Sequence, residues 1–100
     1  MKESQIESKV VKKAKELGFL TYKFSSPSNR GVPDRIFISP HGEVFFMEFK
    51  SEKANVSQLQ KKVINDMCTY GVGVFVVKHF ETGVFLLNVK NDAGFIKNNA

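Results

Sequence analysis

The chain has 100 residues, a formal net charge of +5 and 1 cysteine. We expect a single domain over residues 1–100, because a chain of this length buries one core. A lone cysteine excludes an internal disulfide framework and a thiolate metal site, and fits a reducing, intracellular setting. We expect neither a signal peptide nor a membrane span, because no apolar run is long enough. The basic excess favours a polyanionic partner.

The first half of the chain predicts one helix followed by three strands. The helix shows apolar residues at helical spacing and ends at Gly18. Small and polar residues fill a loop at 25–31, and Pro40-His41-Gly42 forms a tight turn that predicts an antiparallel pair of strands. The expected ranges are 4–17 for the helix and 21–24, 34–39 and 43–50 for the strands.

The second half predicts a helix over 57–70, ended by Gly71, and two apolar strands over 72–78 and 84–89. Glu81-Thr82-Gly83 is interpreted as the turn between these strands. The helix can serve as a crossover that makes its flanking strands parallel neighbours. The resulting order, α-β-β-β-α-β-β, predicts an α/β fold in which helices flank a mixed, twisted sheet.

The pattern richest in chemistry is Gly31-Val32-Pro33-Asp34 followed by Glu48-Phe49-Lys50. Side chains alternate along a strand, so Glu48 and Lys50 share a face, about 6–7 Å apart along the backbone. Counting back from the turn brings Asp34 roughly opposite Glu48. Two carboxylates can hold a hard divalent cation, and a neighbouring lysine can assist hydrolysis, as a metal-dependent phosphodiesterase requires.

Each of these residues also has a structural interpretation. Asp34 alone fits a strand-end carboxylate that bonds nearby backbone. Glu48 and Lys50 alone fit a same-face ion pair worth under ~1 kcal/mol. The combination favours a site, because two acids converging at the end of an apolar strand are costly without a cation.

Two further polar residues have competing interpretations. Glu7 offers a third carboxylate, yet Ser4-Gln5-Ile6-Glu7 also fits a helix capping box. Gln60 shows the same ambiguity, because Ser57-Gln58-Leu59-Gln60 repeats that pattern. Periodicity alone favours capping for both.

Other reactive residue types suggest no second site. His41 and His79 lack the spacing of a zinc site, and we expect them to be structural or exposed. Cys68 lies beside apolar residues of the second helix, which predicts a small core residue rather than a nucleophile.

Basic residues surround the acidic pair on both sides in the sequence. Lysines on a helix surface usually serve solvation, but cations around an acidic pocket also suit an approaching phosphate backbone. The candidates for nucleic-acid binding are Arg30, Arg35, Lys53, Lys61 and Lys62.

Taken together, these residues resemble the virus-type replication-repair nuclease family, VRR-NUC, of the PD-(D/E)xK nuclease superfamily. The resemblance spans most of the chain and includes Val56-Ser57-Gln58-Leu59-Gln60, which matches the family pattern of an apolar residue, Ser or Thr, two variable residues and Gln. Val56 replaces the commoner leucine, and Gln58 stands where proline or glutamate is often found. Neither departure affects a residue with proposed chemistry.

The resemblance implies a restriction-endonuclease-like fold and a role for each motif residue. Asp34, Glu48 and the Phe49 carbonyl would bind Mg²⁺ or Mn²⁺, and Glu7 would complete the acidic site directly or through water. Lys50 would orient the attacking water or stabilise charge, and Gln60 would support Lys50.

Compact stand-alone members of the family are typically viral or bacterial, and they resemble homodimeric endonucleases that resolve DNA junctions. The expected activity is therefore hydrolysis of DNA phosphodiester bonds, with four-way (Holliday) junctions favoured, in the cytoplasm of a bacterium or phage-infected host. Phe95, Ile96 and the final strand are candidates for the dimer contact. The alternative is a non-catalytic nucleic-acid-binding module, although a binder gains nothing from acids in the path of a phosphate.

Overall fold

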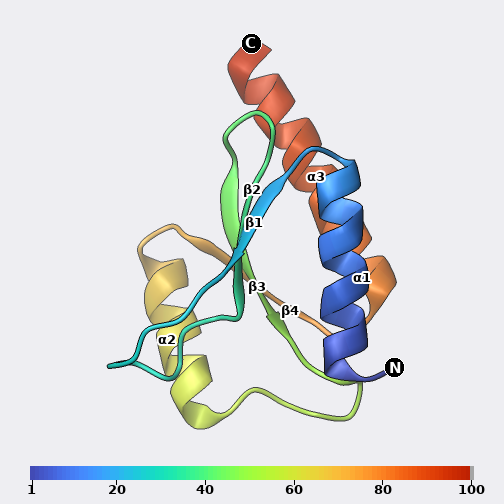
Figure 1. Cartoon of the computed structure of the whole chain (residues 1–100). Helices are drawn as coiled ribbons and strands as arrows, with labels where there is room; N and C mark the ends of the chain where they lie inside the picture. Colours follow the sequence, from blue (N-terminus) through green and yellow to red (C-terminus); the bar gives the residue numbers. More distant parts are fainter. Residues whose placement is uncertain (100) are drawn as a thin grey trace.

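The computed structural model describes the backbone of residues 1–99 and the side chains of residues 1–93. A four-stranded sheet in the order β1-β2-β3-β4 has α1 and α3 on one side and α2 on the other (Figure 1). The elements are α1 (Glu3–Glu16), β1 (Leu20–Lys23), β2 (Arg35–Ile38), β3 (Val44–Phe49), α2 (Gln58–Thr69), β4 (Gly73–Val77) and α3 (Phe80–Asn99).

The sheet is mixed, as the sequence predicts. β1 pairs with β2 and β2 with β3 in antiparallel register, whereas β3 and β4 run parallel. The parallel pair follows from α2, which carries the chain from the end of β3 back to the start of β4. The expected α/β, restriction-endonuclease-like architecture is therefore confirmed.

The core lies between the sheet and the helices α1 and α3. Alternate strand residues such as Phe37, Phe45 and Met47 are fully buried on this side, and Phe37 stacks on Phe45 with ring centroids 5.5 Å apart. α1 contributes Ile6 and Val10 to the same cluster. The period-2 pattern of the strands thus meets the helical stripe of α1, which fixes α1 against the sheet.

The expected final strand is wrong. Residues 84–89 lie inside α3, and Glu81-Thr82-Gly83 is part of that helix rather than a turn. Gly83 and Leu87, four residues apart, are buried, and a Cβ on Gly83 would lie 2.6 Å from Val10 Cγ2. Glycine therefore permits the close approach of α3 to α1. A short apolar run cannot by itself distinguish a strand from a buried helical turn.

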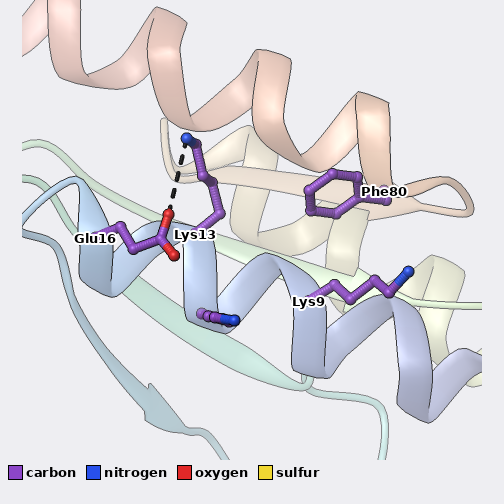
Figure 2. Close-up of a pocket in the computed structure, with 5 residues that line it drawn as sticks. Lys9, Lys13, Glu16 and Phe80 are labelled. Atoms are coloured by element: carbon purple, nitrogen blue, oxygen red, sulfur yellow. Dashed lines mark ion pairs between the residues drawn. The ribbon is translucent and has the colours of Figure 1, made fainter.

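α1 and α3 also enclose a shallow pocket of about 160 Å³ away from the sheet. Its lining combines lysines of α1 with Phe80 at the start of α3 (Figure 2). Lys13 is paired there with Glu16 at 3.9 Å, and their side chains are 38% and 54% exposed. An exposed pair of this kind contributes little to stability.

Two local expectations also fail. α1 begins at Glu3, and the Lys2 backbone N–H donates to Gln5 Oε1 at 2.9 Å, so Ser4 and Glu7 do not cap this helix. Cys68 is exposed on α2 rather than buried in the core. α2 buries Val63, whereas Leu59 on the same helix is exposed. None of the helices in the described part of the chain has the length and apolar character needed to span a membrane.

Candidate active site

The site forms where β2 begins and β3 ends. The register pairs Arg35 with Met47, so one step further places Asp34 opposite Glu48. Asp34 Oδ2 accepts the backbone N–H of Phe49 at 2.8 Å, which fixes the carboxylate against the end of β3. The strand pairing therefore brings together the two acids that the sequence singled out.

The Glu48 carboxylate is buried, which disfavours its charged form. Its side chain is 2% exposed, and Oε1 is buried without a hydrogen-bond partner among the described residues. Burial, followed by the charge of Asp34, raises the pKa of Glu48 to about 7, although Lys50 acts in the opposite direction. A bound cation would offset the cost of burying the ionised carboxylate.

The other oxygen of Glu48 has two partners. Lys50 Nζ lies 3.5 Å from Oε2, and Gln60 Nε2 donates to the same oxygen at 2.9 Å. Gln60 also caps α2, because Oε1 accepts the Ser57 N–H at 2.9 Å while Ser57 Oγ accepts the Gln60 N–H at 3.1 Å. The two interpretations of Gln60 are therefore compatible, and its contact in the site is with Glu48.

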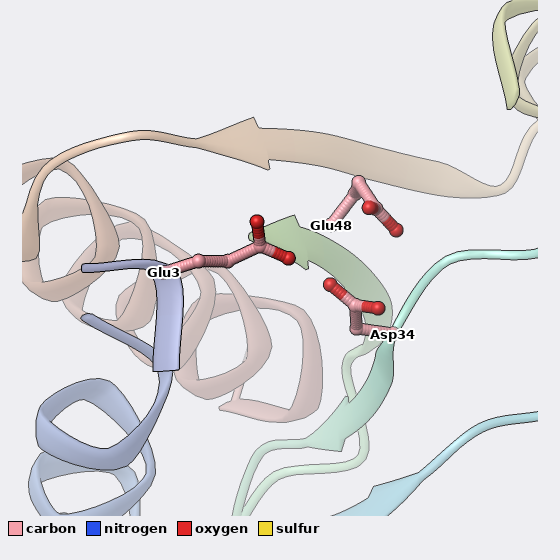
Figure 3. A group of neighbouring side chains, drawn as sticks. All are labelled: Glu3, Asp34 and Glu48. Carbon is pink, nitrogen blue, oxygen red and sulfur yellow. The ribbon is translucent and has the colours of Figure 1, made fainter. Parts of the chain in front are cut away.

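A third carboxylate comes from the first turn of α1. One oxygen each of Glu3, Asp34 and Glu48 lies within 4.8 Å of the others (Figure 3). The sequence patterns indicated Glu7, four residues later on the same helix, and did not indicate Glu3. Residues at this spacing share a helix face, so the pattern allowed either one.

Glu7 has other partners in this structure. Its Oε2 accepts from Arg35 Nε at 2.7 Å and lies 2.7 Å from Lys23 Nζ. Burial raises the pKa of Glu7, but its hydrogen bonds and charge interactions with Lys23 and Arg35 prevail and hold the pKa below its ordinary value. Glu7 is therefore an ionised carboxylate occupied by two cations, outside the acidic cluster.

The predicted basic residues occupy different environments. Among these predicted residues, Arg35 is the least exposed, with 17% of its side chain accessible. Lys62 pairs with Asp66 along α2 at 3.0 Å, and both remain exposed. Arg30, Lys53 and Lys61 are exposed on the loop before β2, the connection after β3 and α2, respectively.

The donor set fits a hard divalent cation. All three clustered side chains offer oxygen, and the buried Glu48 Oε1, which has no hydrogen-bond partner among the described residues, is available to a cation. An aspartate at the start of one strand, Glu-x-Lys at the end of the next and a glutamine on the following helix define a domain of the PD-(D/E)xK nuclease class.

Comparison with known proteins specifies the family. A solved structure described as "VRR_NUC domain" superposes with a TM-score of 0.79 and 28% identity, covering 86% of this chain and 94% of that one. "Putative nuclease p44" of Acyrthosiphon pisum secondary endosymbiont phage 1 is 40% identical over 63 residues, which are 61% of this chain and 68% of that protein. No family model matches the sequence. The chain belongs to the VRR-NUC family.

Proposed function

We propose that this chain is an endonuclease that hydrolyses DNA phosphodiester bonds with Mg²⁺ or Mn²⁺ as cofactor. The observation that carries the proposal is the buried Glu48 carboxylate beside Asp34, one oxygen of which has no hydrogen-bond partner in the described part of the chain. A module that only binds nucleic acid has no use for this costly arrangement, because the acids would repel a phosphate. The family membership and the nuclease name of the phage relative support the same activity.

Asp34, Glu48 and the Phe49 carbonyl would hold the cation, with Glu3 as the carboxylate contributed by α1. Glu3 takes the place first given to Glu7, because Oε2 of Glu7 is shared by Lys23 and Arg35. When bound, the cation would supply Lewis acidity at the phosphoryl group undergoing hydrolysis. An all-oxygen set favours Mg²⁺ or Mn²⁺ over Zn²⁺.

The chain's own residues orient the reactants. The Lys50 ammonium lies beside Glu48 and can donate to the attacking water or to a developing negative charge. Gln60, at the start of α2, donates to the same Glu48 oxygen, Oε2, and holds the carboxylate in one orientation. The Phe49 N–H does the same for Asp34. Three contacts therefore preorganise the two acids before substrate arrives.

We further propose that the enzyme acts as a homodimer that favours branched DNA, four-way junctions in particular. One site cuts one strand, and resolving a junction needs two cuts. A two-fold symmetric pair of chains offers two identical sites to a two-fold symmetric substrate.

A cleavage assay tests the activity. Labelled single-stranded, duplex, flap and four-way-junction DNA are incubated with wild type, Asp34→Asn or Glu52→Gln, in EDTA, Mg²⁺, Mn²⁺ or Ca²⁺. We expect cleavage by wild type in Mg²⁺ and Mn²⁺, little in Ca²⁺ and none in EDTA. The asparagine keeps an oxygen for the Phe49 N–H, so its loss of activity reports the missing charge.

The exposed Glu52 is the control for removing one negative charge, and its variant should cleave normally. Full activity of Asp34→Asn in saturating Mn²⁺ would eliminate the proposed site. DNA binding without cleavage in any metal would favour the binding-module alternative.

A further inference from the structure

A second, open pocket of about 260 Å³ lies between α1 and the strands β1 and β2. It is lined by Ser4, Glu7, Ser8, Val11, Lys23 and Arg35. Two cations and one carboxylate give this lining a net charge of +1, and two hydroxyls add neutral donors. Unlike the acidic cluster, the pocket is therefore suited to an anion.

Glu7 organises the two cations. A single oxygen, Oε2, contacts both Arg35 Nε and Lys23 Nζ at 2.7 Å, and Arg35 is also held by Thr21 Oγ1 at 3.4 Å. Arg35 is thus fixed within the wall, whereas the Lys23 side chain remains 67% exposed and reaches solvent at the pocket. An incoming anion can contact Lys23 without displacing the buried contacts of Arg35.

The pocket and the acidic cluster share a face of α1. Glu3 and Glu7 are one helical turn apart on α1, at a spacing that separates side chains by about 5–6 Å. Arg35 directly follows Asp34 at the start of β2, but successive strand side chains point to opposite faces, so the link between pocket and cluster is the shared face of α1. A DNA strand whose scissile phosphate lies at the cluster can therefore place a neighbouring phosphate at this pocket.

We infer that this pocket binds the non-bridging oxygens of a substrate-strand phosphodiester next to the scissile one. Lys23 makes the contact, Ser4 and Ser8 offer hydroxyl donors, and Glu7 is a positioning residue that holds Lys23 and Arg35. The inference rests on the proposed nuclease function. It gives Glu7 a role different from that of a metal ligand, and it assigns Lys23, which the sequence patterns did not single out.

Binding measurements with Lys23→Met test the contact. The substitution removes the charge but keeps an unbranched stem, and the exposed position tolerates it. Affinity for a short duplex is measured in Ca²⁺ at several salt concentrations. We expect weaker binding and a log–log salt slope reduced by about 0.9, the contribution of one phosphate contact. Lys15→Met, on an exposed part of α1 outside both pockets, removes the same charge and should change the slope less.

A neutral methylphosphonate linkage, moved one position at a time around the cut, locates the phosphate. Wild type should lose affinity at one linkage beside the cut, and Lys23→Met should show no further loss there. A loss that is equal at every linkage would overturn the inference. The inference would also be overturned if Lys23→Met weakened binding only to DNA that carries a 5′-terminal phosphate. The pocket would then bind the end of a strand rather than an internal phosphodiester.

Glu7→Gln separates the two roles of Glu7, since the amide oxygen can still accept from Arg35. We expect an unchanged Mn²⁺ concentration for half-maximal cleavage and an altered KM for DNA. A large rise in the Mn²⁺ requirement would instead identify a metal ligand and refute the positioning role. Failure of wild type to cleave any DNA would remove the proposed function, whereas an unaltered Lys23→Met on a cleaving enzyme would remove only this inference.

Discussion

The side-chain amide of Gln60 ties the start of α2 to the carboxylate of Glu48. Its nitrogen donates to Glu48 Oε2 at 2.9 Å, while its oxygen accepts the N–H of Ser57, the residue that caps the helix. Both ends of the amide are therefore used, one locally and one across the fold. Oε2 is held in this way, whereas Oε1 has no hydrogen-bond partner among the side chains and backbone that the structure describes.

Substituting Gln60 and Ser57 separates these two contacts. Ser57→Ala removes the cap and should lower the free energy of unfolding by about 1 kcal/mol while leaving turnover largely intact. Gln60→Ala removes the cap contact and the Glu48 contact, so it should lower kcat as well. Urea denaturation and steady-state cleavage measure the two effects. Equal kcat values for the two variants would show that Gln60 serves the helix alone.

The buried Glu48 should make the metal-free protein less stable as pH rises. Its pKa is about 7 in the folded chain and 4.5 when solvated, so the folded state binds the extra proton between these values. Stability therefore falls from about pH 4.5 to pH 7, by up to about 3 kcal/mol from this group. Glu48→Gln lacks this titration.

Denaturation in EDTA at pH 5 and pH 8 checks the effect. Relative to wild type, Glu48→Gln should gain stability between the two values. Glu7 titrates in both proteins and cancels in the comparison, and the exposed Glu52→Gln serves as the control. A constant difference between Glu48→Gln and wild type across this range would show that Glu48 titrates normally.

Lys50→Met should lower kcat by at least about tenfold, within the range expected for a residue that aids proton transfer or charge stabilisation. Its ammonium contacts Glu48 but is not a cation ligand, so Mn²⁺ affinity should be unchanged or slightly higher. Titration calorimetry and single-turnover cleavage measure the two quantities. Loss of Mn²⁺ binding in a folded variant would contradict this division of roles.

The homodimer predicts a mass of two chains in light scattering at micromolar concentration, and faster cleavage of four-way junctions than of linear duplex. Phe95 and Ile96, named as contact candidates, lie outside the described side chains. In the segment first expected to be a strand, Phe85 and Val89 are exposed one turn apart on α3. Phe85→Glu should therefore reduce the dimer fraction. A strict monomer equally active on both DNAs would remove the resolvase proposal.

The sequence was sufficient for the parts of the site that depend on local rules. Alternation along β3 put Glu48 and Lys50 on one face, and a tight turn set the register that brings Asp34 opposite Glu48. The capping pattern of Ser57 and Gln60 was also readable, because it involves residues three apart. Each of these relations requires only strand or helix geometry and a short loop.

Tertiary packing decided the rest. The run from Val84 to Val89 is apolar enough for a strand, but in the structure it is part of α3, which Gly83 lets pack closely against Val10 on α1. Glu3 and Glu7 share a helix face, so only the placement of α1 against β2 determines which one meets Asp34. Strands β1 and β2 place Lys23 and Arg35 beside Glu7, and opposite charges in a partly buried site pair. Glu3, one turn earlier, lies with Asp34 and Glu48 instead.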